Sequence, residues 1–258
     1  MVRFIEPHLA KLKSIGYAGN APHKDLANLK DKSLKNIEKF LREIYEIKDE
    51  SEIKLIAQVS NAARDYLENL DMKKFVGRTE LAAARHIEGE LKNKGYLISH
   101  LSIVAGSRLS VTTAGFPSDY QIKKDDVVCV DLGLSMQTYY SDVTRCYFLG
   151  SSQEKYSTIY NQLRTAVLAT AKQIKAGTKS KEIPDILKEN FVKTDLEPDN
   201  VVMADFGHGI GTGKHEYPEI GFDDRVLEKG MVFTLEPEIK LPDGILLRYE
   251  DVFCIDPD

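Results

Sequence analysis

The sequence predicts an α+β fold made of two similar halves, with helices covering one face of an antiparallel sheet. Two observations predict it. Apolar residues recur at helical spacing in four stretches, and segments rich in β-branched and aromatic residues follow each pair of these stretches. Helices followed by strands occur twice along the chain. This order is typical of a fold in which the helices lie on one side of an antiparallel sheet.

The boundaries of these elements come from end signals and composition. Asp49 and Glu52 have the D-x-x-E spacing of a capping box, which marks the start of the first helix. Gly177 is the expected stop of the third helix, because glycine commonly follows the last helical turn. Helices are expected near residues 49–70, 79–95, 151–177 and 184–192, and strands at 127–133, 142–148, 231–237 and 245–255.

The composition excludes several classes of protein. The 258 residues carry a formal net charge of −5 without a basic block, so nucleic acid is not an expected partner. No apolar run approaches the roughly 18 residues that span a bilayer, and the N-terminus lacks the apolar core of a secretory signal. Cys129, Cys146 and Cys254 lack CxxC spacing and are expected to be free thiols that do not bind zinc. A cytoplasmic protein is therefore expected.

Two aspartates lie in or beside an apolar strand. Asp131 interrupts the run VVCVDLG, where a carboxylate is costly to bury unless it is paired or binds a metal. If the chain turns between Met136 and Gln137, Asp142 stands directly opposite Asp131, with the Cβ atoms about 5 Å apart. A cation between the two carboxylates would remove their repulsion. The alternative is that one aspartate caps a turn and the other is exposed.

The segment FGHGIGTGKHEYPEI (206–220) has glycine at alternate positions, which raises the question of a phosphate-binding loop. A P-loop would need glycine at position 208 and Ser or Thr at 215, and both residues are histidine. A dinucleotide-binding fingerprint would need glycine at 212 or 214, where Thr and Lys stand. Both phosphate interpretations fail. What remains is a glycine-rich backbone that presents His208 and His215, each of which could also be purely structural.

Two glutamates end or interrupt later strands. Glu236 closes the run MVFTLEP, and Glu250 lies within LLRYEDVF on the strand face that also carries Arg248. Taken alone, Glu250 fits a plain ion pair with Arg248. Four carboxylates and one histidine in apolar or glycine-rich contexts together fit two divalent cations, with Mn, Co or Fe favoured and Zn as an alternative. The predicted ligands are Asp131, Asp142, His208, Glu236 and Glu250.

These residues resemble the pita-bread metallopeptidases (the creatinase/aminopeptidase fold), which include Xaa-Pro dipeptidase (prolidase), aminopeptidase P and methionine aminopeptidase. The resemblance covers about residues 48–258 and is strongest to the proline-specific branch, through GFPSDYQIKKDDVVCVDLG and YYSDVTR. It implies two pseudo-symmetric halves with helices packed on a curved antiparallel sheet. Residues 1–47 would then be a short remnant of, or replacement for, the N-terminal domain of prolidases.

The resemblance also implies a role for each predicted ligand. Asp142 and Glu250 would bridge the two metal ions. Asp131 would hold one ion, and His208 with Glu236 would hold the other.

Three residues would act in catalysis by the same resemblance. Glu236 would carry a proton to the leaving nitrogen after water attacks the scissile carbonyl. His215 would donate a hydrogen bond to the developing oxyanion. Arg248 would orient Glu250 or bind charge on the substrate.

Two positions depart from the proline-specific branch. Ala114 replaces a histidine before the G-x-P-S-D stretch, and Ala204 replaces one four residues ahead of His208. We expect a metallo-exopeptidase that cleaves next to the N-terminal residue of short peptides, with Xaa-Pro bonds as substrate and an activity weakened by these alanines. The alternatives are a catalytically inactive metal-binding scaffold and a methionine aminopeptidase-like enzyme. A homodimer is expected only by analogy with that branch.

Overall fold

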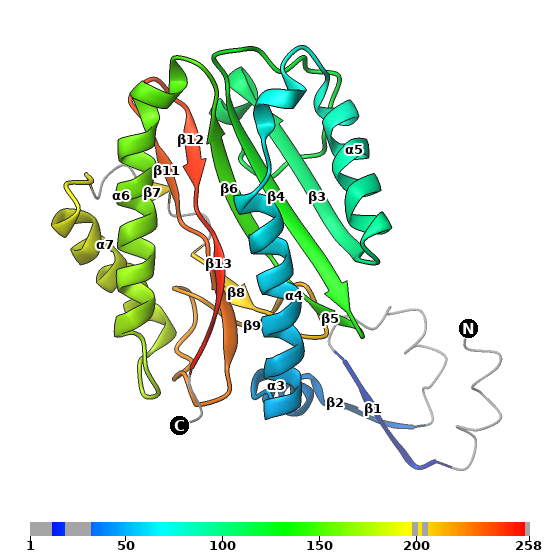
Figure 1. Cartoon of the computed structure of the whole chain (residues 1–258). Helices are drawn as coiled ribbons and strands as arrows, with labels where there is room; N and C mark the ends of the chain where they lie inside the picture. Colours follow the sequence, from blue (N-terminus) through cyan, green and yellow to red (C-terminus); the bar gives the residue numbers. More distant parts are fainter. Residues whose placement is uncertain (1–11, 19–31, 198–200, 203–205, 256–258) are drawn as a thin grey trace. The chain divides into compact units, whose positions relative to one another are not determined.

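The computed structural model describes residues 12–18, 32–197, 201–202 and 206–255 (Figure 1). The chain divides into two compact units, Met1–Glu46 and Ile47–Asp258. The division falls within one residue of the boundary expected from the sequence, and the assignment of a role to each unit stays a prediction. Within the described residues, no helix combines the length and apolar character that crossing a membrane requires.

Over its described residues, 12–18 and 32–46, the first unit contains one helix and two short strands. Its elements are β1 (Ser14–Tyr17), β2 (Ser33–Asn36) and α3 (Glu38–Glu46), and the two strands pair in parallel. The Asn36 side chain accepts a hydrogen bond from the backbone N–H of Glu38 at 2.8 Å, and this satisfies one free donor at the start of α3.

The first half of the second unit is a sheet covered by two helices. Its elements are α4 (Glu50–Glu68), η1 (Met72–Phe75), α5 (Glu80–Asn93), β3 (Leu97–Ala105), η2 (Gly106–Ser110), β4 (Val127–Met136), β5 (Tyr139–Tyr140) and β6 (Val143–Phe148). β4 is the central strand and runs antiparallel to β3 on one side and to β5 and β6 on the other. Both α4 and α5 lie on the same face of this sheet (Figure 1).

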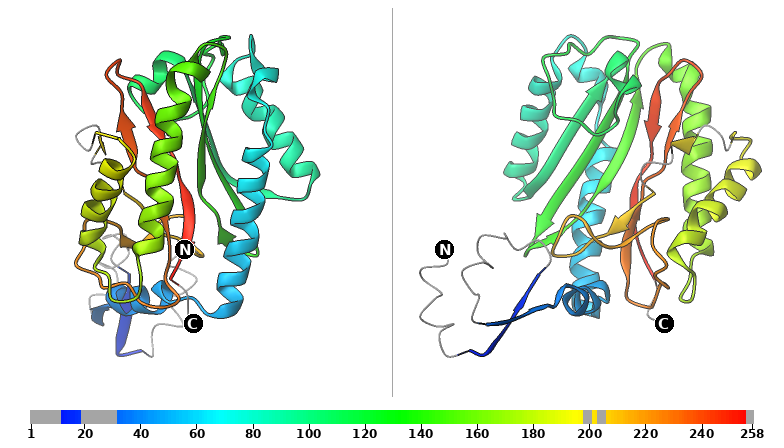
Figure 2. Two further views of the ribbon diagram at one scale, coloured as in Figure 1. Left: turned by 60° about the vertical axis from the view of Figure 1, so that its left-hand side comes forward. Right: turned by 180° about the vertical axis from the view of Figure 1, so that it is seen from behind.

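The second half repeats the arrangement with shorter strands. Its elements are α6 (Ser152–Gln173), η3 (Ser180–Glu182), α7 (Ile183–Lys193), β7 (Val201–Val202), β8 (His208–Gly209), β9 (Glu216–Glu219), β10 (Val232–Leu235), β11 (Glu238–Lys240), β12 (Leu246–Arg248) and β13 (Asp251–Cys254). They form two antiparallel sheets in the orders β13-β10-β8-β9 and β12-β11-β7. Viewed from behind, the strands of both halves lie in front of α4, α5 and α6 (Figure 2).

Among the described residues, the helices bury two large apolar clusters, and a third, small cluster joins Ile56 of α4 to Ile210 and Val232. Under α4 and α5 the core includes Leu67, Ile87 and Val130, and under α6 and α7 it includes Leu163 and Phe191. The predicted α+β arrangement of two halves is confirmed, and so is the capping box. Asp49 Oδ1 accepts from the backbone N–H of Glu52 at 2.9 Å, and the Glu52 carboxylate accepts from the backbone N–H of Asp49 at 2.8 Å.

The expected strands were incomplete. β3 was missed, because its sequence LISHLSIVA mixes polar and apolar residues and its outer half is only partly buried. The strand expected over 245–255 is split at Tyr249 and Glu250 into β12 and β13, which belong to different sheets.

The two halves meet at β6 and β13. Thr144 and Glu250 form an antiparallel bridge, in which the Glu250 N–H donates to the Thr144 carbonyl at 3.3 Å. The buried Arg145 guanidinium holds this junction, because it donates to both the Thr144 and Glu250 carbonyls. It also makes two hydrogen bonds of 3.0 Å to the buried carboxylate of Asp251. Both of these bonds come from the guanidinium nitrogen Nη2, while Nη1 donates to the two carbonyls, and such charge-assisted hydrogen bonds are stronger than those between neutral groups.

We expect Asp251→Ala to lower the free energy of unfolding by about 3–5 kcal/mol, because the buried Arg145 charge would lose its buried carboxylate partner. Urea unfolding followed by circular dichroism measures this loss. Asp224→Ala is the matched control, since Asp224 pairs with Lys181 at the exposed surface and should leave the midpoint unchanged. Equal midpoints for the two variants would show that the Arg145 pair does not hold the junction.

Candidate metal centre

The structure brings the five predicted ligands into one buried region. Asp131 lies in the middle of β4, and Asp142 in the break between β5 and β6. His208 is in β8, Glu236 directly follows β10, and Glu250 separates β12 from β13. All five residues are at most 6% exposed. The first half of the unit therefore supplies two carboxylates, and the second half supplies the imidazole and two more.

Distances among these groups fit a shared coordination site. Ligand atoms of His208, Glu236 and Glu250 all lie within 4.8 Å of one another. His208 Nε2 is 3.2 Å from Glu236 Oε1 and 3.8 Å from Asp142 Oδ2. The Thr234 hydroxyl fixes two of the ligands, because it donates to Glu236 Oε1 and accepts from the backbone N–H of His208.

The pairing of the two aspartates differs from the expected one. Gln137 and Thr138 both have positive φ, at 48° and 71°, and they form the two-residue turn that such values favour. The turn thus lies one residue later than expected, and Asp131 pairs with Thr144. The predicted direct opposition of Asp131 and Asp142 is wrong. A shift of two positions keeps the same face of the sheet, so the carboxylates still reach one another along the diagonal.

Glu250 tests whether these residues fit a cation. Its Oε2 accepts from the Thr144 hydroxyl at 2.6 Å, while its buried Oε1 has no hydrogen-bond partner. Burial, followed by the nearby negative charges of Asp142 and Glu236, raises the pKa of Glu250 well above its usual range. An unpartnered oxygen in a cluster of acids is the arrangement that a divalent cation would satisfy.

The two aspartates are affected differently by the same surroundings. Burial and the charge of Asp131 raise the pKa of Asp142 above its usual range. Burial also opposes ionisation of Asp131, but hydrogen bonding and charge from His100 outweigh it and lower the pKa of Asp131. The charge of Asp131 thus disfavours ionisation of Asp142, and a cation placed between the two carboxylates would remove this repulsion.

His208 presents one defined nitrogen to the cluster. Its Nδ1 lies 2.9 Å from the Gly209 carbonyl and is placed to donate to it, which leaves Nε2 free to bind a metal. The flanking glycines allow close backbone contacts. A Cβ on Gly207 would clash with the Thr234 carbonyl, and one on Gly209 would clash with the Tyr217 carbonyl. The glycines therefore bring β8 against its two neighbouring strands.

Of the three predicted catalytic residues, Glu236 belongs to the cluster, and His215 and Arg248 lie beside it. The His215 ring stands edge-on to the His208 ring, 4.1 Å between centroids. Burial and the neighbouring positive charge of His208 lower the pKa of His215 to about 4, which keeps its imidazole neutral near pH 7. Arg248 contacts Glu236 at 3.3 Å and Glu238 at 2.9 Å. The guanidinium thus pairs with carboxylates other than Glu250, the partner expected from the sequence.

Two further basic residues belong to the site. Lys214 Nζ lies 3.5 Å from Asp142 Oδ2. His100, on the unexpected strand β3, places Nε2 at 2.9 Å from Asp131 and 3.0 Å from Asp142. Sequence reasoning missed His100, because the strand that carries it mixes polar and apolar residues and was not recognised.

The structure describes one of the two alanines that depart from the proline-specific branch. Ala204 lies outside the described residues. Ala114 has an exposed side chain in a turn after η2, where the Thr112 hydroxyl donates to its carbonyl at 2.8 Å and accepts from its N–H at 3.1 Å. The turn keeps its shape through the backbone, so it does not depend on the side chain at position 114.

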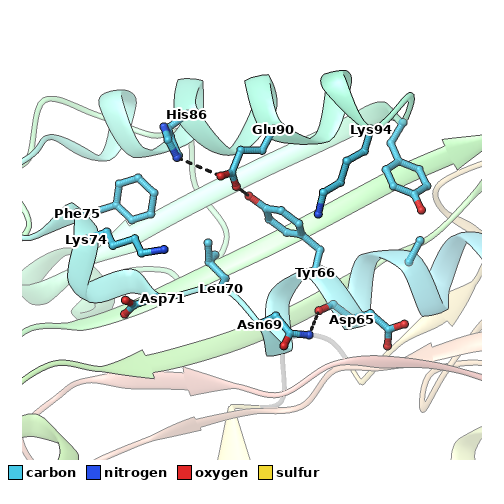
Figure 3. A pocket seen from close by; sticks show the side chains of 12 residues that line it. Asp65, Tyr66, Asn69, Leu70, Asp71, Lys74, Phe75, His86, Glu90 and Lys94 are labelled. Carbon is cyan, nitrogen blue, oxygen red and sulfur yellow. Dashed lines mark hydrogen bonds and ion pairs between the residues drawn. The ribbon is translucent and has the colours of Figure 1, made fainter.

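Two hollows in the structure differ in their relation to the cluster. A cleft of about 490 Å³ is lined by His208 and His215, together with Tyr217 and Phe222. The second hollow lies between α4 and α5 (Figure 3). There Tyr66 donates to Glu90 at 2.7 Å, so its polar groups satisfy one another. The first hollow is the one that reaches the predicted ligands.

Comparison with known proteins agrees with this geometry. Residues 51–257 match the model of metallopeptidase family M24. An Xaa-Pro dipeptidase of Pyrococcus horikoshii is 30% identical over 253 residues, 96% of this chain and 72% of that protein. The prolidase from Pyrococcus furiosus has a TM-score of 0.84 at 29% identity, over 99% of this chain and 77% of that chain. The X-Pro aminopeptidase from Thermotoga maritima, with a TM-score of 0.81 at 23% identity over 99% of this chain and 74% of that one, shows the fold alone.

The family match covers nearly all of the second unit. A pita-bread fold with a buried acidic cluster defines a metal-dependent hydrolase. The chain belongs to metallopeptidase family M24. The family implies divalent metal ions, and the unpartnered Glu250 oxygen fits that requirement. The resemblance seen in the sequence is confirmed at the level of the family and the fold.

We expect Glu250→Gln to stabilise the metal-free protein and to abolish stabilisation by metal. The pKa of Glu250 is raised on folding, so its ionisation opposes folding at pH values above about 4.5, the usual value for glutamate. The stability gap between variant and parent should therefore widen as the pH rises from 4 to 7. Thermal unfolding with a chelator and with added Mn or Co measures both effects, and a variant that metal still stabilises fully would contradict the expectation.

Proposed function

We propose that this chain is a dinuclear metallo-exopeptidase that cleaves Xaa-Pro bonds at the N-terminal end of short peptides. The observation that carries the proposal is the convergence of five buried ligand groups from both halves of the fold on one region containing an unpartnered carboxylate oxygen. The Xaa-Pro dipeptidases among its relatives support the choice of substrate.

The ligand assignment divides the groups between two ions. Asp142 and Glu250 would bridge the ions, Asp131 would complete the first site, and His208 with Glu236 would complete the second. The donors favour Mn, Co or Fe, with Zn as the alternative. When bound, such ions lower the pKa of coordinated water toward about 7 and so supply a nucleophile at neutral pH.

The remaining steps fall to side chains of this chain. Glu236 is placed to take the proton from the attacking water and pass it to the leaving nitrogen, since Arg248 and His208 keep its pKa low despite burial. The neutral imidazole of His215 can donate to the oxyanion that develops on the scissile carbonyl. Arg248 acts as a positioning residue, because it holds Glu236 at 3.3 Å.

The second unit, Ile47–Asp258, contains all of these groups, so we assign catalysis to it. The cleft beside His215 offers room for a short peptide, and its Tyr217 and Phe222 side chains provide the apolar walls that a proline ring favours. The first unit would stand in for the N-terminal domain of prolidases, and a homodimer remains an expectation by analogy.

Hydrolysis by the metal-loaded protein tests the proposal. After loading with Mn or Co, we expect two ions per chain and cleavage of Ala-Pro or a longer Xaa-Pro peptide. Asp131→Asn should bind less metal and lose activity, while Asp125→Asn at the surface should retain both. Cleavage of Met-Ala-Ser alone would indicate a methionine aminopeptidase-like enzyme. Metal binding without turnover of any peptide would favour the non-catalytic scaffold.

Position 114 offers a gain-of-activity prediction. If the site is otherwise competent, Ala114→His should raise kcat for Xaa-Pro hydrolysis by about 10²-fold, since one donor to a developing oxyanion typically contributes about that factor. The exposed turn should accept the larger side chain without loss of stability. Steady-state kinetics with Ala-Pro measure the change, and an unchanged kcat would mean that position 114 does not limit the reaction.

A further inference from the structure

We propose that His100 is a sixth protein ligand, which binds the metal ion held by Asp131 and Asp142. The inference rests on the proposed dinuclear site and adds to it an imidazole from β3. Each of the two ions would then have one histidine, His100 on one side and His208 on the other.

The first support is the direction of the His100 side chain. The register of β3 against β4 shifts between Ile98 and His100, so Ser99 is an extra residue in the strand. Such bulges re-aim neighbouring side chains. His100 pairs with Gly133 and lies on the same face as Asp131, which pairs with Ser102. Its side chain is only 18% exposed, so the imidazole is directed into the site.

The second support is the space that Gly133 leaves for the ring. A Cβ at position 133 would collide with Cε1 and Nδ1 of His100. The imidazole therefore lies directly over the backbone of β4, in room that only glycine provides. A ring held by a bulge on one side and a glycine on the other has few alternative positions.

The third support is the distance from Nε2 to the two aspartates. Nε2 lies 2.9 Å from Asp131 Oδ1 and 3.0 Å from Asp142 Oδ1. Two ligand atoms at right angles, each about 2.1 Å from one ion, are about 3.0 Å apart. A protonated Nε2 shared between the two oxygens in a three-centre hydrogen bond gives similar lengths, and a divalent cation that replaces this proton would have the same three atoms as its ligands. A cation among the three atoms satisfies all of them.

The fourth support concerns the other ring nitrogen. His100 Nδ1 lies 3.1 Å from the Ser99 hydroxyl. Metal-binding histidines usually donate their second ring N–H to an oxygen, and this fixes the tautomer. With the proton on Nδ1 and donated to Ser99, the Nε2 lone pair is directed at the two carboxylates.

The added imidazole has a chemical consequence. The ion at Asp131 would otherwise have only oxygen ligands from the protein, which suits hard ions such as Mn. A nitrogen ligand moves the preference toward Co, Fe and Zn. Replacement of His100 should therefore shift metal selectivity back toward Mn, as well as weaken binding.

Cobalt binding tests this assignment without measuring activity. In the Co(II)-loaded chain, proton NMR should show two paramagnetically shifted, exchangeable imidazole N–H signals, from His100 and His208. His100→Gln should lose one signal and raise the Kd for one of the two ions at least tenfold. His86→Gln is the matched control, because His86 is 47% exposed on α5 and pairs with Glu90, and it should keep both signals and both affinities.

A second variant distinguishes the loss of a metal ligand from misfolding of the protein. Ser99→Ala keeps the imidazole but removes its oxygen partner, so the His100 signal should remain and exchange faster with water. Both signals and an unchanged Kd in His100→Gln would overturn the inference while leaving peptide hydrolysis intact. Two imidazole signals without peptide hydrolysis would overturn the proposed function and support the ligand assignment. A parent protein that binds no cobalt would overturn both.

Discussion

Four carboxylates can share one buried region only if something offsets their mutual repulsion and their loss of water. In this protein Asp131, Asp142, Glu236 and Glu250 are all buried, and the nearest cations are His100, His208, Lys214 and Arg248. These groups leave one Glu250 oxygen unpartnered. The strands around the site hold these carboxylates close together despite their repulsion. Divalent ions would offset the negative charge that remains.

At the junction of the two halves, specific hydrogen bonds hold the backbone beside the carboxylate cluster. Arg145 binds the carbonyls on either side of the Thr144–Glu250 bridge and the carboxylate of Asp251. Glu250 is thus fixed through its backbone carbonyl, which accepts from Arg145, and through its side chain, which accepts from the Thr144 hydroxyl. Rigid placement of this kind allows a carboxylate to bridge two ions, because little reorganisation is needed when they bind.

The sequence was enough to find the five candidate ligands, since a charged residue inside an apolar strand has a local signature. It was not enough to place them. The register of β4 depends on positive φ values at Gln137 and Thr138, which neither residue type announces. His100 was missed because β3 alternates too weakly to be recognised as a strand, and the partners of Arg248 depend on which strands become neighbours. Such contacts depend on which strands pair over long range, and the local sequence pattern does not encode that pairing.

The order of the predicted ligands along the chain has a consequence for metal binding. Asp131 and Asp142 come from the first half, and so does His100, whereas Glu250 lies between β12 and β13, near the end of the second half. In a growing polypeptide the set stays partial until Glu250 forms its bridge with Thr144 of β6. Affinity in an unfolded chain follows the intrinsic series that favours copper, whereas a preformed cavity selects by geometry. Selection by geometry therefore belongs to the finished fold, in which all of the predicted ligands have been brought together.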